Sequence, residues 1–202
     1  MTRRVAIIDV AVVGGMSLVY VVLEALDVPK RWSFLVVGVA LVWYASLLWR
    51  RRTHSLYAMG FRRDNLMSGL VPVGVSTVVA GIGLVTWAIA HGRAVWGPEV
   101  LILLALYPVW ALVQQLGFQG LFHRGLMELV PSPVLQVLGT AAAFACVHWG
   151  NPTLFGLTFM AGVAWSVLYR RWPNLWLLAG SHTVLAALAY PLVLGDAPLS
   201  RV

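Results

Sequence analysis

Long hydrophobic runs, separated by short polar or proline-containing breaks, divide the whole chain. A helix needs about 20 apolar residues to cross a bilayer. We predict seven such helices at residues 5–26, 33–49, 67–90, 99–128, 133–149, 153–169 and 173–195. Prolines stand at several predicted starts, where a missing backbone N–H costs nothing. The pattern therefore predicts an all-α polytopic membrane bundle.

Composition supports a membrane protein of one unit. Hydrophobic residues make up 60% of the 202 residues and charged residues only 10%, whereas a soluble domain has roughly 25% charged residues. We expect one membrane domain over 1–202, with N-terminal helices in 1–98 and a core in 99–195. The run at 5–26 is too long for a signal peptide and lacks a small-residue cleavage site, so we expect a retained span.

The positive charges predict an orientation. With the N-terminus in the cytoplasm, ten of the fourteen lysines and arginines fall on the inner side, as the positive-inside rule requires. The net charge of +7 then reflects topology and contact with membrane lipids, and no nucleic-acid partner is expected because no soluble basic face exists. The preference for Arg over Lys, with abundant Ala, Val, Leu and Gly, indicates a bacterial cytoplasmic membrane.

Polar side chains inside the spans are costly and mark candidate sites. Apart from charged residues at the ends of the fourth span, they are Asp9, Glu24, Gln114, Gln115, Gln119, Gln136, His148 and His182. Asp9 and Glu24 lie near the ends of the first span, and Gln136 lies near the start of its helix, so we expect these three at the interface. The other five are the candidate site.

Depth brings the candidate residues together. At 1.5 Å per residue, Gln115 lies roughly 20 Å and His148 roughly 22 Å from the inner ends of their helices, and His182 lies roughly 13 Å from its own. Gln115 and Gln119 share one helix face at i, i+4. Two histidines with amides are a poor zinc set, which needs three or four N, S or carboxylate ligands. We therefore predict neither a metal nor a cofactor.

Three short motifs carry a resemblance to a known family. Phe144-Ala-Cys-Val-His148 matches Phe-x-x-x-His, and His182-Thr-Val-Leu-Ala186 matches the histidine of His-x-x-x-Asn/Asp. Gln114-Gln115-Leu-Gly-Phe-Gln119 lies where Glu-Glu-x-x-x-Arg is expected. In this order the motifs resemble the CPBP family, the CAAX-protease and bacteriocin-processing (Abi) intramembrane proteases. The similarity covers roughly residues 59–195, since residues 59–63 resemble the short basic stretch these proteins often carry.

The resemblance implies an intramembrane endopeptidase in which glutamates activate a water and histidine and asparagine stabilise the oxyanion. Its catalytic positions would be Gln114, Gln115, Gln119, His148 and His182, with Ala186 in place of asparagine. An alternative alignment, anchored on Arg124-Gly125, puts Gln119 and Gly120 at the glutamate positions. Neither alignment restores a carboxylate, and an amide cannot act as a general base.

Three hypotheses remain open. The chain is a CPBP-type peptidase with altered chemistry, in which His148 serves as the base and the substrate is a peptide or a prenylated or other membrane protein. Alternatively, it is a catalytically silent pseudoenzyme that binds a peptide or lipid segment as a chaperone, sensor or immunity factor. In the third, it is a small structural membrane protein whose interior amides hold helices together.

Overall fold

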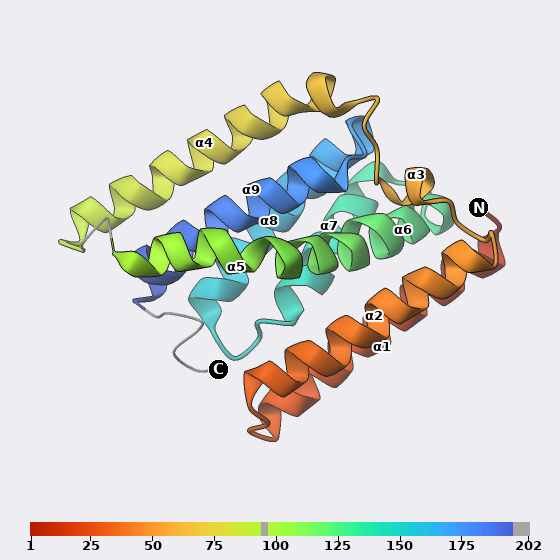
Figure 1. The fold of residues 1–202 in the computed structure, drawn as a ribbon, viewed down its shortest axis with the longest axis horizontal. Helices are drawn as coiled ribbons and strands as arrows, with labels where there is room; N and C mark the ends of the chain where they lie inside the picture. Colours follow the sequence, from red (N-terminus) through yellow and green to blue (C-terminus); the bar gives the residue numbers. More distant parts are fainter. Residues whose placement is uncertain (94–96, 196–202) are drawn as a thin grey trace.

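Helices account for almost all of the part of the chain that the computed structural model describes, residues 1–93 and 97–195, and no strand occurs within those ranges. In chain order the elements are α1 (Arg3–Ala25), α2 (Lys30–Arg50), α3 (Leu56–Met59), α4 (Leu66–Ala90), α5 (Pro98–Gln115), η1 (Leu116–His123), α6 (Arg124–Leu129), α7 (Pro133–Cys146), α8 (Pro152–Arg171), α9 (Leu175–Ala189) and η2 (Tyr190–Leu194). The all-α prediction is confirmed (Figure 1).

The helix starts follow from local capping chemistry. Pro98, Pro133 and Pro152 each occupy the first turn of a helix, where the missing N–H is harmless. The side chain of Asn151 accepts a hydrogen bond from the Leu154 N–H, and Asn174 does the same for the start of α9. The proline breaks in the sequence therefore predicted these boundaries to within a few residues.

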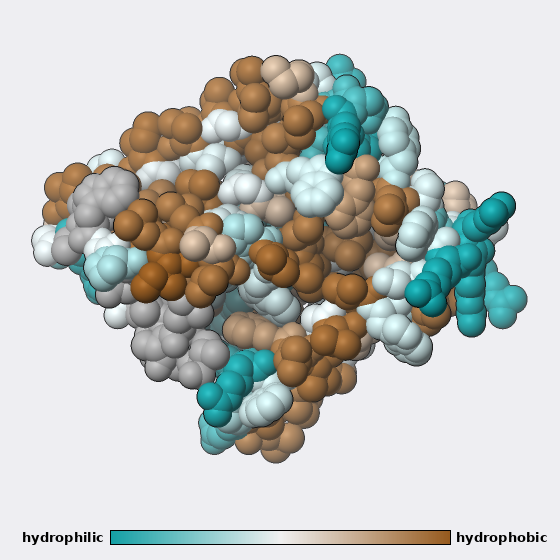
Figure 2. All heavy atoms as spheres, viewed as in Figure 1, coloured by the Kyte–Doolittle hydropathy of each residue, from teal (hydrophilic) through white to brown (hydrophobic). Residues whose placement is uncertain are grey.

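Within the described residues, six helices are long and apolar enough to cross a membrane: Arg3–Ala25, Lys30–Arg50, Leu66–Ala90, Val100–Leu129, Pro152–Arg171 and Leu175–Leu194. The fifth predicted span, 133–149, is shorter than expected, because α7 ends at Cys146 after 14 residues. Figure 2 shows hydrophobic surfaces along the bundle, with hydrophilic residues gathered toward its ends. These helices identify the chain as an integral membrane protein.

Helix α9 lies between α4 and α5 (Figure 1), and the α1–α2 hairpin packs against η1 and α6. Helices α7 and α8 pack tightly at Gly162, where an added Cβ would lie 2.9 Å from the Ala141 Cα. Small residues at such a contact let two backbones approach, which is how membrane helices gain packing energy. The pairs α5–α9 and α7–α8 thus set the positions of the candidate site residues.

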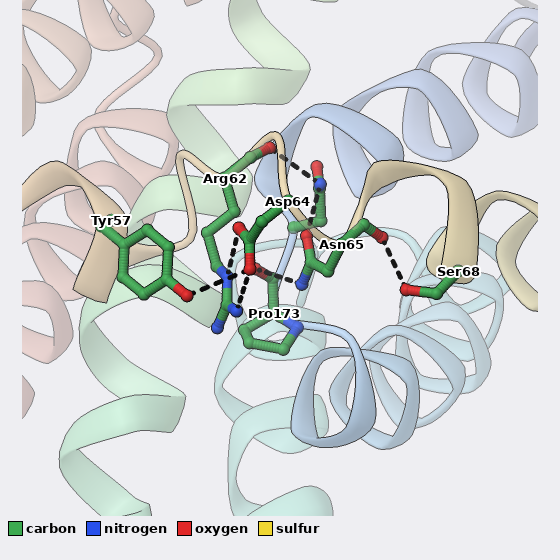
Figure 3. Close-up of polar contacts among 7 residues, drawn as sticks. Tyr57, Arg62, Asp64, Asn65, Ser68 and Pro173 are labelled. Carbon is green, nitrogen blue, oxygen red and sulfur yellow. Dashed lines mark hydrogen bonds and ion pairs between the residues drawn. The ribbon is translucent and has the colours of Figure 1, made fainter.

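A polar cluster fixes the loop between α3 and α4 (Figure 3). The guanidinium of Arg62 donates to both carboxylate oxygens of Asp64, at 3.1 and 2.6 Å, and the Tyr57 hydroxyl donates to the same carboxylate at 3.0 Å. The Arg62 hydrogen bonds lower the pKa of Asp64 to about 2. The Asn174 amide donates to the Arg62 carbonyl and to the Asn65 side chain, which ties this loop to the start of α9.

Two residues expected at the interface are buried instead. Asp9 accepts hydrogen bonds from the Tyr44 hydroxyl at 2.6 Å and from His54 Nε2 at 2.7 Å. Gln136 donates to the Val130 carbonyl and accepts from Arg170. These interfacial predictions were wrong because each side chain finds its partners within the bundle, which removes the need to reach water.

Candidate functional site

The candidate site is built on a change of helix type. Helix α5 continues into the π-helical segment η1 without a break, and η1 continues into α6. Gln115, Gln119 and His123 follow one another at four-residue intervals here, and their exposed fractions are 2%, 1% and 0%. Since π-helical turns are rare and frequently occur at functional sites, this row of buried polar side chains is the natural starting point.

Gln115 meets the histidine of α9. Its Nε2 lies 3.4 Å from His182 Nδ1, a long hydrogen bond. With the amide in this orientation the nitrogen can only donate, so His182 Nδ1 accepts and the proton of the neutral ring is on Nε2. His182 therefore has an N–H available to donate to a ligand in the cavity described next.

A cavity of about 460 Å³ lies among α4, α8 and α9 and contains both candidate histidines in its wall. Tyr107, Trp165 and Tyr190 line it as well, and most of the remaining lining is apolar. No carboxylate belongs to the lining of this cavity within the described residues. An environment of this kind favours an apolar ligand that also offers a few hydrogen-bonding groups.

Phe144 holds the two histidines in place. Its ring centroid lies 6.0 Å from that of His148 and 5.7 Å from that of His182, both with edge-to-face geometry. The Trp165 ring lies 4.6 Å from that of His182 and 5.8 Å from that of Phe144, so the three rings pack against one another. Contacts of this type orient imidazoles without using their nitrogens, so both rings keep their polar atoms for other partners.

The other two glutamines lie away from this cavity. Gln119 is one turn further along and donates from Nε2 to the Ser166 hydroxyl at 3.1 Å. The Oε1 of Gln114 accepts a hydrogen bond from the Tyr107 hydroxyl at 3.5 Å. Gln114 lines a different, small cavity of about 50 Å³, which His148 also borders. His148 and His182 thus line one cavity, and Gln115 contacts His182 from outside its described lining, to which Gln114 and Gln119 do not belong either.

The alternative alignment meets a steric limit at Gly120. A Cβ at this position would lie 2.9 Å from the backbone oxygen of Met59. Real Cβ atoms essentially never approach a neighbour so closely, so the second position of that alignment has no room for a carboxylate side chain unless the chain at Met59 moves.

Sequence reasoning missed His123. Its Nδ1 lies 2.7 Å from the Thr140 hydroxyl, which itself donates to the Gln136 carbonyl at 2.8 Å. Because the hydroxyl has one proton, His123 Nδ1–H must be the donor and Nε2 bears a lone pair. The available signal was the four-residue spacing from Gln119, which puts His123 on the same helix face.

Three buried acceptors along this row have no hydrogen-bond partner among the described residues: Gln115 Oε1, Gln119 Oε1 and His123 Nε2. An unpaired buried acceptor costs about 1–3 kcal/mol. These unpaired acceptors lower the stability of the segment. Local features that cost stability occur mainly at functional or strained sites.

No group of three His, Cys, Asp or Glu side chains suited to a metal ion occurs in the described part of the chain. His148 and His182 share a cavity wall with aromatic and aliphatic side chains, no acid belongs to its described lining, and the Gln115 amide contacts His182. The residues present therefore do not form a zinc site of the usual three- or four-ligand kind.

Comparison with known proteins identifies a family for part of the chain. A family model described as type II CAAX prenyl endopeptidase, Rce1-like, matches residues 94–188. This segment contains Gln114, Gln115, Gln119, His148 and His182, the residues expected from the motifs. No curated protein and no solved structure matches the chain. Residues 94–188 are therefore an Rce1-like domain of the type II CAAX prenyl endopeptidase family, the CPBP/Abi family.

Proposed function

We propose that the chain is an Rce1-like protein of the bacterial cytoplasmic membrane, with its N-terminus in the cytoplasm, that binds peptide-containing membrane segments in the cavity lined by His148 and His182. We further propose that it does not perform the family's glutamate-dependent hydrolysis. The observation that carries this proposal is the absence of any carboxylate from the described lining of that cavity.

Binding without water activation follows from the chemistry of the groups present. A water must lose a proton to attack a peptide carbonyl, and a glutamine amide cannot accept that proton. The Nε2–H of His182, in contrast, can donate to a substrate carbonyl oxygen. Apolar and aromatic walls suit a prenylated or otherwise hydrophobic chain, so the family's membrane-protein and peptide substrates define the expected ligand class.

Altered hydrolysis is the second candidate, because His148 lines the same cavity as His182. An imidazole has the right basicity for general-base catalysis near neutral pH. In this alternative His148 would take the proton of a water, and Gln115 would orient the substrate through its amide.

The deciding experiment uses the full chain in lipid nanodiscs with a prenylated fluorescent peptide. We expect the wild type to bind the peptide, as followed by fluorescence anisotropy, and to leave it uncleaved, while a glutamate-bearing family member cleaves it. His182→Phe should weaken binding, and His91→Phe, an exposed histidine at the end of α4, is the matched control that should not.

Two further variants separate the candidates. Gln115→Glu places a carboxylate beside His182, and cleavage gained in this variant would support an otherwise intact cavity. Cleavage by the wild type that disappears in His148→Ala would refute the silent protein and establish the second candidate. Absence of peptide binding in the wild type would refute both.

A further inference from the structure

A second cavity lies outside the histidine site, in a groove between α2 and α5. Its volume is about 700 Å³ and its lining is almost wholly apolar or aromatic. Its walls face outward from the bundle, since Val39 on α2 is 59% exposed and Val109 on α5 is 74% exposed. Tyr107 and Tyr190 line both this groove and the histidine cavity, so they form a shared wall.

The groove has the length of one lipid chain. Along α2 its lining extends from Arg31 to Trp43, and along α5 from Leu103 to Val113. At 1.5 Å per residue these distances are about 18 and 15 Å. The hydrocarbon of one leaflet is about 15 Å thick, half of the roughly 30 Å core. An extended acyl chain of one leaflet therefore matches the groove from end to end.

One positively charged side chain belongs to the described lining of the groove and lies at its end. Arg31 lines its end beside the α1–α2 turn. The neighbouring Lys30 is paired with Glu24 at 3.3 Å, whereas the Arg31 guanidinium has no hydrogen bond or ion pair to any residue that the structure describes. A guanidinium binds phosphate oxygens in a bidentate manner, and no acidic residue lines the groove in the described chain.

We infer that this groove binds one anionic glycerophospholipid of the outer leaflet. The phosphate lies at Arg31 and one acyl chain fills the space between α2 and α5, with its side against Tyr107 and Tyr190. The site is distinct from the peptide cavity and adds a lipid ligand to the proposed function, and its test requires no peptide.

The test is native mass spectrometry of the detergent-solubilised full chain with added palmitoyl-oleoyl phosphatidylglycerol or the matching phosphatidylcholine. We expect one phosphatidylglycerol to remain bound at energies that strip phosphatidylcholine. Arg31→Gln should weaken retention about tenfold, as expected for loss of one charged hydrogen-bonding group, and Arg31→Lys should restore part of it.

A groove-filling pair localises the lipid. Val39→Trp places a ring in the groove and should abolish retention. Val36→Trp is the matched control, because Val36 is similarly exposed at 54% but does not line the groove. Equal retention of both lipids, retention unaffected by Arg31→Gln, or stronger binding of the uncharged prenyl alcohol farnesol would each overturn the inference.

Discussion

Replacing Gln115 by leucine should stabilise the protein, which is unusual for a buried polar residue. The wild-type side chain makes one long hydrogen bond, 3.4 Å to His182, and its Oε1 has no partner among the described residues. Losing the bond leaves His182 Nδ1 without this donor and costs about 1 kcal/mol because the bond is long, whereas removing the unpaired acceptor gains about 1–3 kcal/mol. Gln115→Leu should therefore raise the free energy of unfolding by about 1 kcal/mol.

Gln136→Leu is the matched comparison. Gln136 is also buried, yet both ends of its amide are bonded, to the Val130 carbonyl and to Arg170. The same chemical change removes two hydrogen bonds and leaves both partners unpaired, so we expect a loss of about 2–3 kcal/mol. The two substitutions should thus change the free energy of unfolding in opposite directions.

The assay is reversible unfolding in mixed micelles followed by tryptophan fluorescence, since the chain has ten tryptophans. Peptide binding is measured on the same samples, and Gln115→Leu should bind less well although it is more stable. If Gln115→Leu is as destabilising as Gln136→Leu, the Oε1 of Gln115 has a hydrogen-bond partner. That result would refute the inference that Gln115 lowers the stability of the protein.

Two further predictions concern packing and pH. Gly162→Ala should lower the free energy of unfolding by about 1–3 kcal/mol through overpacking, because the new Cβ would lie 2.9 Å from Ala141 Cα. Gly156→Ala on the same helix has nothing within 4 Å of its new Cβ, so it should raise the melting temperature slightly through the higher helix propensity of alanine. Thermal melting curves of both variants check these expectations. In the Asp64–Arg62 pair, the folded pKa of Asp64, about 2, lies below its unfolded pKa of about 3.9. The contribution of this pair to stability is therefore complete above pH 4 and disappears as the pH falls toward 2. An Asp64→Asn variant should lack this part of the pH dependence of stability, and identical stability profiles of the two proteins between pH 6 and 2 would contradict the expectation.

Helix positions were predictable because they depend on neighbouring residues. Hydrophobic runs of spanning length and prolines at the first turn are visible in the sequence, and α4 was expected at 67–90 and found at Leu66–Ala90. The contact between Gln115 and His182 could also be predicted, since the rise per residue places both residues within about two turns of the same depth. Gln114 shows the limit of this reasoning, because a step of one residue rotates a side chain by about 100°.

The features that could not be predicted from the sequence depend on contacts between segments that lie far apart in the chain. Asp9 is buried because Tyr44 and His54, 35 and 45 residues away, supply its hydrogen-bond donors. No hydrophobic pattern contains that information. The π-helical turns at Leu116–His123 likewise exchange the regular hydrogen-bond pattern for a wider one, and this is decided by packing against other helices rather than by local propensity. His123 was therefore overlooked at the end of a long apolar helix.

The hydrogen-bond partners of Arg124 explain how the protein can fold although the described lining of the histidine cavity has no acidic residue. Half-buried Arg124 donates to His54 Nδ1 at 3.5 Å, and His54 Nε2 in turn donates to the Asp9 carboxylate at 2.7 Å. A buried guanidinium without a counter-charge would be strongly destabilising, and α1 provides that charge through one imidazole. Asp9 does not line the cavity of His148 and His182, so the carboxylate that balances Arg124 cannot activate a water there. The chain thus balances the charge of Arg124 with an acid on a different helix, and this arrangement is compatible with the binding without hydrolysis proposed above.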